Sequence, residues 1–95
     1  MSDDLSHIES EASRSAEFLR LFAANQPRIF AYILSLVPQW NDAEEVLQET
    51  CVVLWQSFDR FQAGTNFRAW AMRIAFDQVR TFRRKNKRAS LLSDE

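Results

Sequence analysis

The feature that most constrains the fold of this chain is its scarcity of residues that interrupt a helix. Its 95 residues contain one glycine and two prolines. A β-rich fold of this size needs many tight turns, and glycine and proline are the residues that most often supply them. Hydrophobic residues make up 46% and charged residues 26% of the chain, which is a globular balance rather than a disordered one. We therefore predict an all-α fold, a small helical bundle of three to four helices in one domain.

Apolar residues recur at every third or fourth position, which predicts amphipathic helices. Residues 14–25 form the first such segment. Because proline is tolerated in the first turn of a helix but not in its interior, Pro27 predicts a break near residues 25–26. A second helix is then expected from residue 27 to about residue 37. Its apolar stripe consists of Ile29, Phe30, Ile33, Leu36 and Val37.

Two more helices are predicted in the rest of the chain. One runs from about Asp42 to Phe58, with Asn41 or Asp42 as its N-cap. Its apolar stripe consists of Leu47, Cys51, Leu54, Phe58 and Phe61, at spacings of 4, 3, 4 and 3. After a loop at residues 62–66, Thr65 or Asn66 can cap the last helix, from residue 67 to about residue 87. Its inward stripe consists of Ala71, Ile74, Ala75, Gln78, Val79 and Phe82.

The two ends of the chain lack apolar periodicity. We predict a disordered N-terminus over residues 1–13 and a helical domain over residues 14–88. Residues 89–95 are expected to be the disordered start of a linker.

Several classes of function lack the residues they need. Cys51 and His7 are the chain's only cysteine and histidine, too few for an internal disulfide or a Cys/His metal site. The sequence offers no plausible Cys–His or Ser–His–Asp set around His7. The place of Cys51 on an apolar stripe favours a core thiol over a reactive one. No apolar run approaches the about 20 residues that span a bilayer, and the polar start does not resemble a signal peptide. We expect a cytoplasmic protein that is not an enzyme and uses no cofactor, metal or membrane.

The net charge of −1 conceals a strong asymmetry along the chain. Residues 1–67 carry four basic and ten acidic side chains. Residues 68–88 carry eight basic side chains and a single acid, Asp77. A basic segment that follows an acidic one is typical of a domain that contacts nucleic acid with only part of its surface.

The acidic part contains a candidate docking face. Glu45, Gln48 and Glu49 lie at helical spacings of 3 and 4, so they share a face opposite Leu54. Spacing alone favours an ordinary solvated face with a helix-dipole benefit. The alternative is a surface that binds a basic partner.

The last helix combines an aromatic segment with a basic one. Trp70, close to Arg68 and Arg73, is either a core residue or a stacking surface for an unstacked base, which is worth about 1–3 kcal/mol per base. The run at residues 80–88 holds six cations, more than a helix C-terminus requires. Phosphate contact explains the excess, through Arg80, Arg83, Arg84, Lys85, Lys87 and Arg88.

Together and in this order, the segments resemble region 2 of an extracytoplasmic-function (ECF) RNA polymerase sigma factor. The stretch DAEEVLQETCVVLWQSFDRF is similar to the family's D-A-E-[DE]-L-V-Q-E-x-F-x-x-[LV]-W signature. FRAWAMRIA is similar to F-x-x-W-L-x-R-I-A, and the Arg/Lys-rich helix end follows it. The resemblance runs from about Phe18 to Arg88.

The resemblance implies two interfaces for a transcription initiation factor. In the family, the signature helix docks on the clamp helices of the largest subunit of core RNA polymerase. On this chain that interface falls on Glu45, Leu47, Gln48, Glu49, Val52 and Trp55. The family's loop and last helix read the minus-ten promoter element and hold the melted non-template strand. Those roles fall on the loop from Phe61 to Asn66 and on Phe67, Trp70, Arg73, Ile74 and Asp77, with Arg68 beside them.

The chain departs from the family pattern at two positions. Asp77 stands where the family usually has Asn, and Thr81 stands where it often has Asp. An aspartate repels phosphate but can accept a hydrogen bond from cytosine N4, so the promoter preference is expected to differ. The family's second domain, a helix-turn-helix that reads the upstream promoter element, has no counterpart in these 95 residues.

Two alternatives remain at this stage. The chain could be a generic helical nucleic-acid-binding module without a polymerase contact, or an interaction protein whose basic end is only a solvated tail. An anti-sigma factor is a further possible partner that the resemblance implies, and its identity is open.

Overall fold

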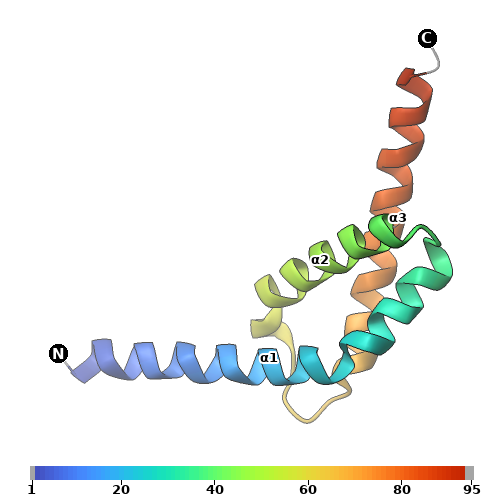
Figure 1. The fold of residues 1–95 in the computed structure, drawn as a ribbon. Coiled ribbons are helices and arrows are strands. Elements are labelled where there is room, and N and C mark those ends of the chain that lie inside the picture. The colour runs from blue at the N-terminus through green and yellow to red at the C-terminus, as the bar shows by residue number, and fades with distance from the viewer. Residues whose placement is uncertain (1, 94–95) are drawn as a thin grey trace.

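The computed structural model describes the backbone of residues 2–93 and the side chains of residues 8–93. Within that range the chain is helical and has no strand: α1 (Ser2–Leu36), α2 (Trp40–Gln56), the short 3-10 helix η1 (Phe58–Arg60) and α3 (Phe67–Ser93). Each of the three α-helices contacts the other two, while the start of α1 and the end of α3 project from the bundle (Figure 1). The extents are 61 × 27 × 19 Å. The prediction of an all-α bundle is confirmed.

The core lies where the three α-helices meet. Its buried apolar side chains are Phe18, Ile29, Ile33, Val37, Ala43, Val46, Leu54, Phe58, Phe67, Ala71, Ala75 and Val79. Alanines 43, 71 and 75 are fully buried, and their small size allows the helix backbones to approach closely. The buried polar side chain Thr50 is satisfied because its Oγ1 donates to the Val46 carbonyl at 2.7 Å.

α1 is one helix across Pro27, so the predicted break near residues 25–26 is wrong. Figure 1 shows that α1 instead changes direction in its second half, as expected where a proline removes a backbone donor. Asn25 adds a side-chain hydrogen bond from Nδ2 to the Leu21 carbonyl at 2.8 Å just before the proline. Phe18 and Ile29 are buried on either side of the bend. Packing of both halves thus offsets the cost of an interior proline, about 3 kcal/mol.

The helices also extend into the ends for which disorder was expected. α1 begins at Ser2 and α3 continues to Ser93, while Met1 and residues 94–95 lie outside the described residues. Residues 8–13 and 83–93 are exposed, so the core does not cover these turns. They contain no glycine or proline, and extension of a formed helix costs far less than nucleation of a new one.

α2 begins two residues earlier than predicted, at Trp40. Gln39, rather than Asn41 or Asp42, precedes the helix, and its side chain makes no capping hydrogen bond. Asp42 instead lies in the first turn, where its charge is favourable to the helix dipole. α2 ends at Gln56, and Phe58 opens η1.

The loop between η1 and α3 follows the prediction more closely. α3 begins at Phe67, and Asn66 Oδ1 accepts from the Ala69 backbone N–H at 3.1 Å, as an N-cap does. Thr65 Oγ1 donates to the Gln62 carbonyl at 2.6 Å. Gly64 has a φ of 87°, a left-handed conformation that favours glycine.

Candidate docking and nucleic-acid interfaces

The predicted acidic face lies on the outer side of α2. Glu45, Gln48 and Glu49 are all exposed. Val52 is 46% exposed and Trp55 37% exposed, so both extend this face with apolar surface. Leu47 differs, because it is half-buried and packs against the core. The face therefore presents carboxylates and an amide beside two large apolar side chains.

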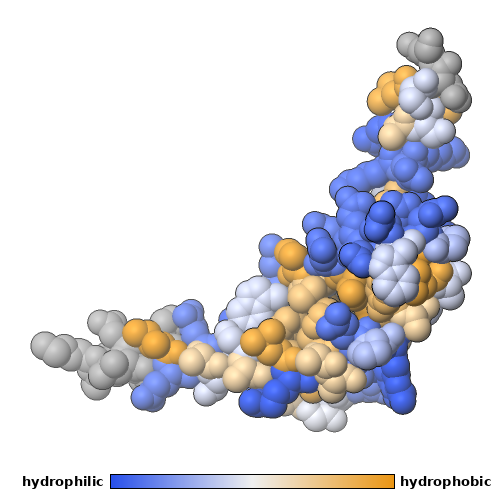
Figure 2. Space-filling model, in the orientation of Figure 1, coloured by the Kyte–Doolittle hydropathy of each residue, from blue (hydrophilic) through white to orange (hydrophobic). Residues whose placement is uncertain are grey.

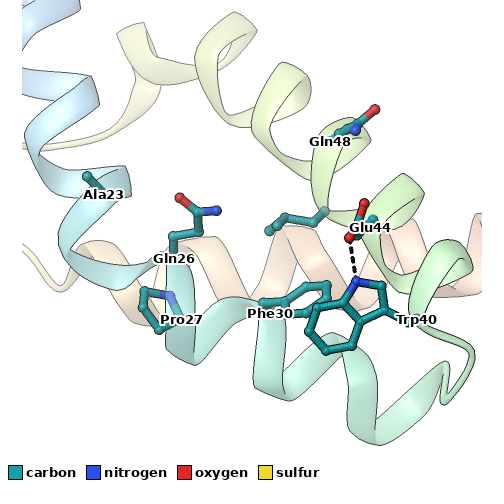
Figure 3. Close-up of a pocket in the computed structure, with 8 residues that line it drawn as sticks. Ala23, Gln26, Pro27, Phe30, Trp40, Glu44 and Gln48 are labelled. Carbon is teal, nitrogen blue, oxygen red and sulfur yellow. Dashed lines mark hydrogen bonds between the residues drawn. The ribbon is translucent and has the colours of Figure 1, made fainter.

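A groove of about 600 Å³ separates α1 from the first half of α2. Figure 3 shows the Trp40 ring beside Phe30, with which it makes an edge-to-face contact at 4.9 Å between centroids. The Trp40 indole N–H donates to Glu44 Oε1. The lining residues are Ala23, Gln26, Pro27, Phe30, Trp40, Glu44, Leu47 and Gln48. Through Leu47 and Gln48 the groove joins the residues predicted to bind polymerase.

Sequence reasoning missed this groove because it placed Trp40 in the connection between the helix expected to end near residue 37 and the helix expected to begin near Asp42. Trp40 is 59% exposed, although tryptophan is highly buried on average, and its ring adds apolar surface to the groove. The signal that could have found it is a tryptophan directly before a helix start, four residues from a carboxylate.

A second groove, of about 410 Å³, lies between the first half of α1 and the second half of α2. It is lined by Ser15, Phe18, Leu19, Cys51, Val52, Trp55 and Gln56. Cys51 is half-buried, and desolvation raises the pKa of its thiol. Leu19 is 62% exposed at the edge of the groove. The candidate docking face of α2 is thus flanked by apolar surface on its α1 side.

Arg14 connects α1 to the end of α2. Its guanidinium lies 4.7 Å from the centroid of the Trp55 ring, a cation–π contact. The same guanidinium makes an ion pair with Asp59 at 2.7 Å. Arg14 therefore contacts one face of the Trp55 ring and, through Asp59, links α1 to η1.

The predicted base-stacking residues belong to a cluster of aromatic rings at the loop end of the bundle. Phe67 is only 4% exposed, so it supports the core and offers no face to a base in this structure. It contacts Phe61 at 5.5 Å and Trp70 at 5.8 Å between centroids. Phe61 and Trp70 are half-buried, 5.1 Å apart, beside the exposed loop at residues 62–66. These two rings are the aromatic surface available next to the loop.

The outer side of α3 carries a row of charged residues. Arg73, Asp77, Arg80, Arg84 and Arg88 follow at spacings of 4, 3, 4 and 4, and all are exposed. Asp77 therefore sits on the same face as its neighbouring arginines. Lys87 is exposed nearby, whereas Arg68 and Ile74 are half-buried. Figure 2 shows hydrophilic side chains gathered where α3 leaves the bundle.

Two cations of the basic run differ from this row. Arg83 donates from a guanidinium nitrogen to the Leu36 carbonyl at the end of α1, at 2.8 Å. Lys85 lines a small groove of about 120 Å³ between α2 and α3, together with Glu45 and Glu49. The basic run thus faces three directions instead of one.

Neither a metal-binding cluster nor a membrane-spanning helix occurs in the described part of the chain. Among residues 8–93, His, Cys, Asp and Glu form no group of three or more that could hold a metal ion. In the same part of the chain, none of the helices has the combination of length and apolar character that a membrane span requires.

Comparison with known proteins identifies a family. Residues 21–89 match the profile of sigma-70 region 2. The chain is 35% identical over 63 residues to the RNA polymerase sigma factor CarQ of Myxococcus xanthus, covering 66% of this chain and 36% of CarQ. It is 33% identical over 48 residues to the RNA polymerase sigma factor NccH of Alcaligenes xylosoxydans xylosoxydans, covering 50% of this chain and 25% of NccH. No solved structure matches the chain.

The matched region contains the second half of α1, all of α2 and the loop, and α3 as far as residue 89. The matches span about a third or less of the curated relatives' own length. Both candidate interfaces on α2 and α3 lie inside the matched region, which covers well over half of the chain. This chain belongs to the sigma-70 region 2 family.

Proposed function

We propose that this chain acts in transcription initiation, as the part of a sigma factor that binds core RNA polymerase and engages the minus-ten promoter element. The observation that carries the proposal is that one small bundle exposes an acidic and apolar face on α2 and a row of arginines on α3. Membership of the sigma-70 region 2 family supports the same division.

The face of α2 suits a basic, helical partner, in this proposal the clamp helices of the largest polymerase subunit. Glu45 and Glu49 offer carboxylates to such a partner's cations, and Gln48 offers an amide between them. Val52 and Trp55 add the apolar area that a stable interface requires. The two grooves beside α1 can receive side chains of the same partner.

The loop and α3 suit the melted non-template strand. Phe61 and Trp70 provide half-exposed rings beside an open loop, where an unstacked base can pack. Arg73, Arg80 and Arg84 lie on one exposed face, where they can contact successive phosphates. Asp77 lies within that row and can accept a hydrogen bond from cytosine N4, so it is the candidate for base preference.

Binding to purified core polymerase tests the docking face. We expect Glu45→Gln combined with Glu49→Gln to weaken binding. Neutral replacements are preferable to lysines because Lys85 lines the same groove as both carboxylates, and a reversed charge would repel it. The matched control is Glu17→Gln, an exposed acid on α1 outside the family match. The unfolding temperature should stay nearly constant, because exposed helix charges contribute only tenths of a kcal/mol.

The outcome separates the proposal from a generic nucleic-acid-binding module. Such a module predicts salt-dependent binding to single-stranded DNA without polymerase and equal behaviour of the double variant and Glu17→Gln. Core binding that is lost in the double variant and kept in the control supports a sigma factor. Unchanged core affinity in both variants would contradict the proposal.

A further inference from the structure

We infer that Arg83 is a positioning residue: it fixes the direction in which the basic end of α3 leaves the bundle, instead of contacting phosphate itself. The inference rests on the proposed function of α3 in DNA binding. It adds to the proposed function, because it assigns different roles to neighbouring cations of the basic run at residues 80–88.

The first observation is the bond that Arg83 makes. Its guanidinium donates to the Leu36 carbonyl at 2.8 Å. The two residues are 47 positions apart, whereas the side-chain hydrogen bonds of Asn25, Thr50 and Asn66 join residues only three or four apart. The bond therefore joins α3 to α1 rather than stabilising a turn of its own helix.

The second observation concerns the C-terminal end of α1. The last carbonyls of a helix have no partner within the helix, and a cation there is favoured by the helix dipole. The last turn of α1 contains no basic residue. Arg83 supplies that cation from another helix, so the C-terminal end of α1 provides a specific acceptor for it.

The third observation is the position of Arg83 on α3. Val79 is fully buried and Phe82 is half-buried against the core, but every residue from 83 to 93 is exposed. Figure 1 shows this last part of α3 rising clear of the bundle beyond the end of α1. Arg83 is thus placed at the point where the helix departs, and there its bond to Leu36 restrains the direction of the exposed part.

The remaining cations depend on that direction. Arg84 and Arg88 lie on the outer row with Arg80, and Lys87 is exposed beyond them. A row of cations contacts successive phosphates only while it keeps a fixed angle to the base-reading end of the helix. A cation at a helix C-terminus is worth up to about a five-fold change in population at an exposed site. Loss of the bond should therefore lower apparent DNA affinity by about two- to five-fold, through the smaller fraction of correctly directed molecules.

The test compares three variants of the full chain: Arg83→Ala, Arg84→Ala and Asn25→Ala. Asn25→Ala is the matched structural control, because it also removes one side-chain hydrogen bond to a carbonyl of α1 but joins no second helix. The first readout is the salt dependence of binding to a melted promoter in the presence of core polymerase. Arg84→Ala should reduce the slope by about 0.7–0.9, the effect of one lost phosphate contact. Arg83→Ala should weaken binding with the slope unchanged.

The second readout is a distance between two spin labels, which the loss of a phosphate contact alone would leave unchanged. Labels at Ala31→Cys and Ser90→Cys, in a Cys51→Ala background, report the direction of α3 relative to α1; both sites are exposed. Arg83→Ala should broaden the distance distribution, and Arg83→Lys should restore part of the narrow one because an ammonium can donate to the same carbonyl. Asn25→Ala and Arg84→Ala should leave the distribution narrow.

A reduced salt slope in Arg83→Ala with a narrow distance distribution overturns the inference and makes Arg83 a phosphate contact. A narrow distribution with wild-type DNA binding also overturns it. If the wild-type chain shows no polymerase-dependent DNA binding, the proposed function fails. The distance measurement then still decides whether Arg83 directs α3.

Discussion

Replacement of Phe18 by alanine tests whether the folded unit begins before the region that matches the family. Phe18 precedes the match at residues 21–89, yet it is only 3% exposed. Its ring contacts Trp55 at 5.3 Å and Phe58 at 5.2 Å between centroids, and it also packs against Phe22 and Phe67. The turn of α1 around Phe18 is therefore part of the core, although residues 8–13 before it are exposed.

The expected cost follows from this burial. Phenylalanine-to-alanine changes in a core reduce the free energy of unfolding by about 3–5 kcal/mol. The total stability of a domain is about 5–15 kcal/mol, so the change removes a large share of it. One kcal/mol shifts the unfolding temperature of a domain this small by about 4–8 °C, so we expect a decrease of about 12 °C or more.

Thermal unfolding followed by circular dichroism at the helical band measures this decrease. Tryptophan fluorescence, to which Trp55 beside Phe18 contributes, gives an independent signal. The matched control is Leu19→Ala, the adjacent residue, which is 62% exposed and should change stability by about 0.5 kcal/mol or less. Equal unfolding temperatures for the two variants would refute the packing argument. They would also place the start of the folded domain after residue 19.

Three further predictions concern single residues. Asn66→Ala should reduce the free energy of unfolding by about 0.5–2 kcal/mol, because it removes the cap of α3; Thr65→Ala, which spares the cap, is the control in chemical denaturation. Burial raises the pKa of the Cys51 thiol, so alkylation by iodoacetamide at pH 8 should be slower than for an unstructured peptide and should rise steeply only at higher pH. An equal rate at pH 8 would contradict this. Asp77→Asn should change the preferred base in the minus-ten element, measured with single-base promoter variants, and an unchanged preference would exclude Asp77 as a reader.

The helical class and much of the core follow from local chemistry, and for that reason the sequence predicts them. Buried residues such as Ile29, Ile33 and Leu54 lie on the apolar stripes identified from spacing alone. The Asn66 cap was likewise expected from the preference of asparagine for that position. The resemblance to the family depended on motifs with fixed spacing, and such motifs can be read from one sequence without knowledge of the fold.

Where the structure differs from what the local sequence suggests, the physical cause is the same: packing between helices determined the outcome. Pro27 predicts a break from local sterics, but the core on both sides of the bend keeps α1 continuous. Phe67 stands next to a loop and an arginine, yet the other rings bury it, and its role in DNA binding stays a prediction. Trp40 was assigned to a connection, and its contact with Phe30 depends on how α1 returns toward α2. None of these outcomes can be read from a stretch of adjacent residues.

The basic run at residues 80–88 shows most clearly that the local sequence does not determine what a side chain contacts. Residues 83, 84 and 85 are adjacent and chemically similar, so a charge count treats them as one phosphate-binding block. Successive helical residues point about 100° apart. Arg83 therefore reaches the end of α1, Arg84 stays on the outer row, and Lys85 lines the groove with the carboxylates of α2. Helical spacing alone separates the three directions, but only the positions of α1 and α2 determine what each cation meets. How many of these cations remain free to contact another molecule is thus a property of the bundle rather than of the run.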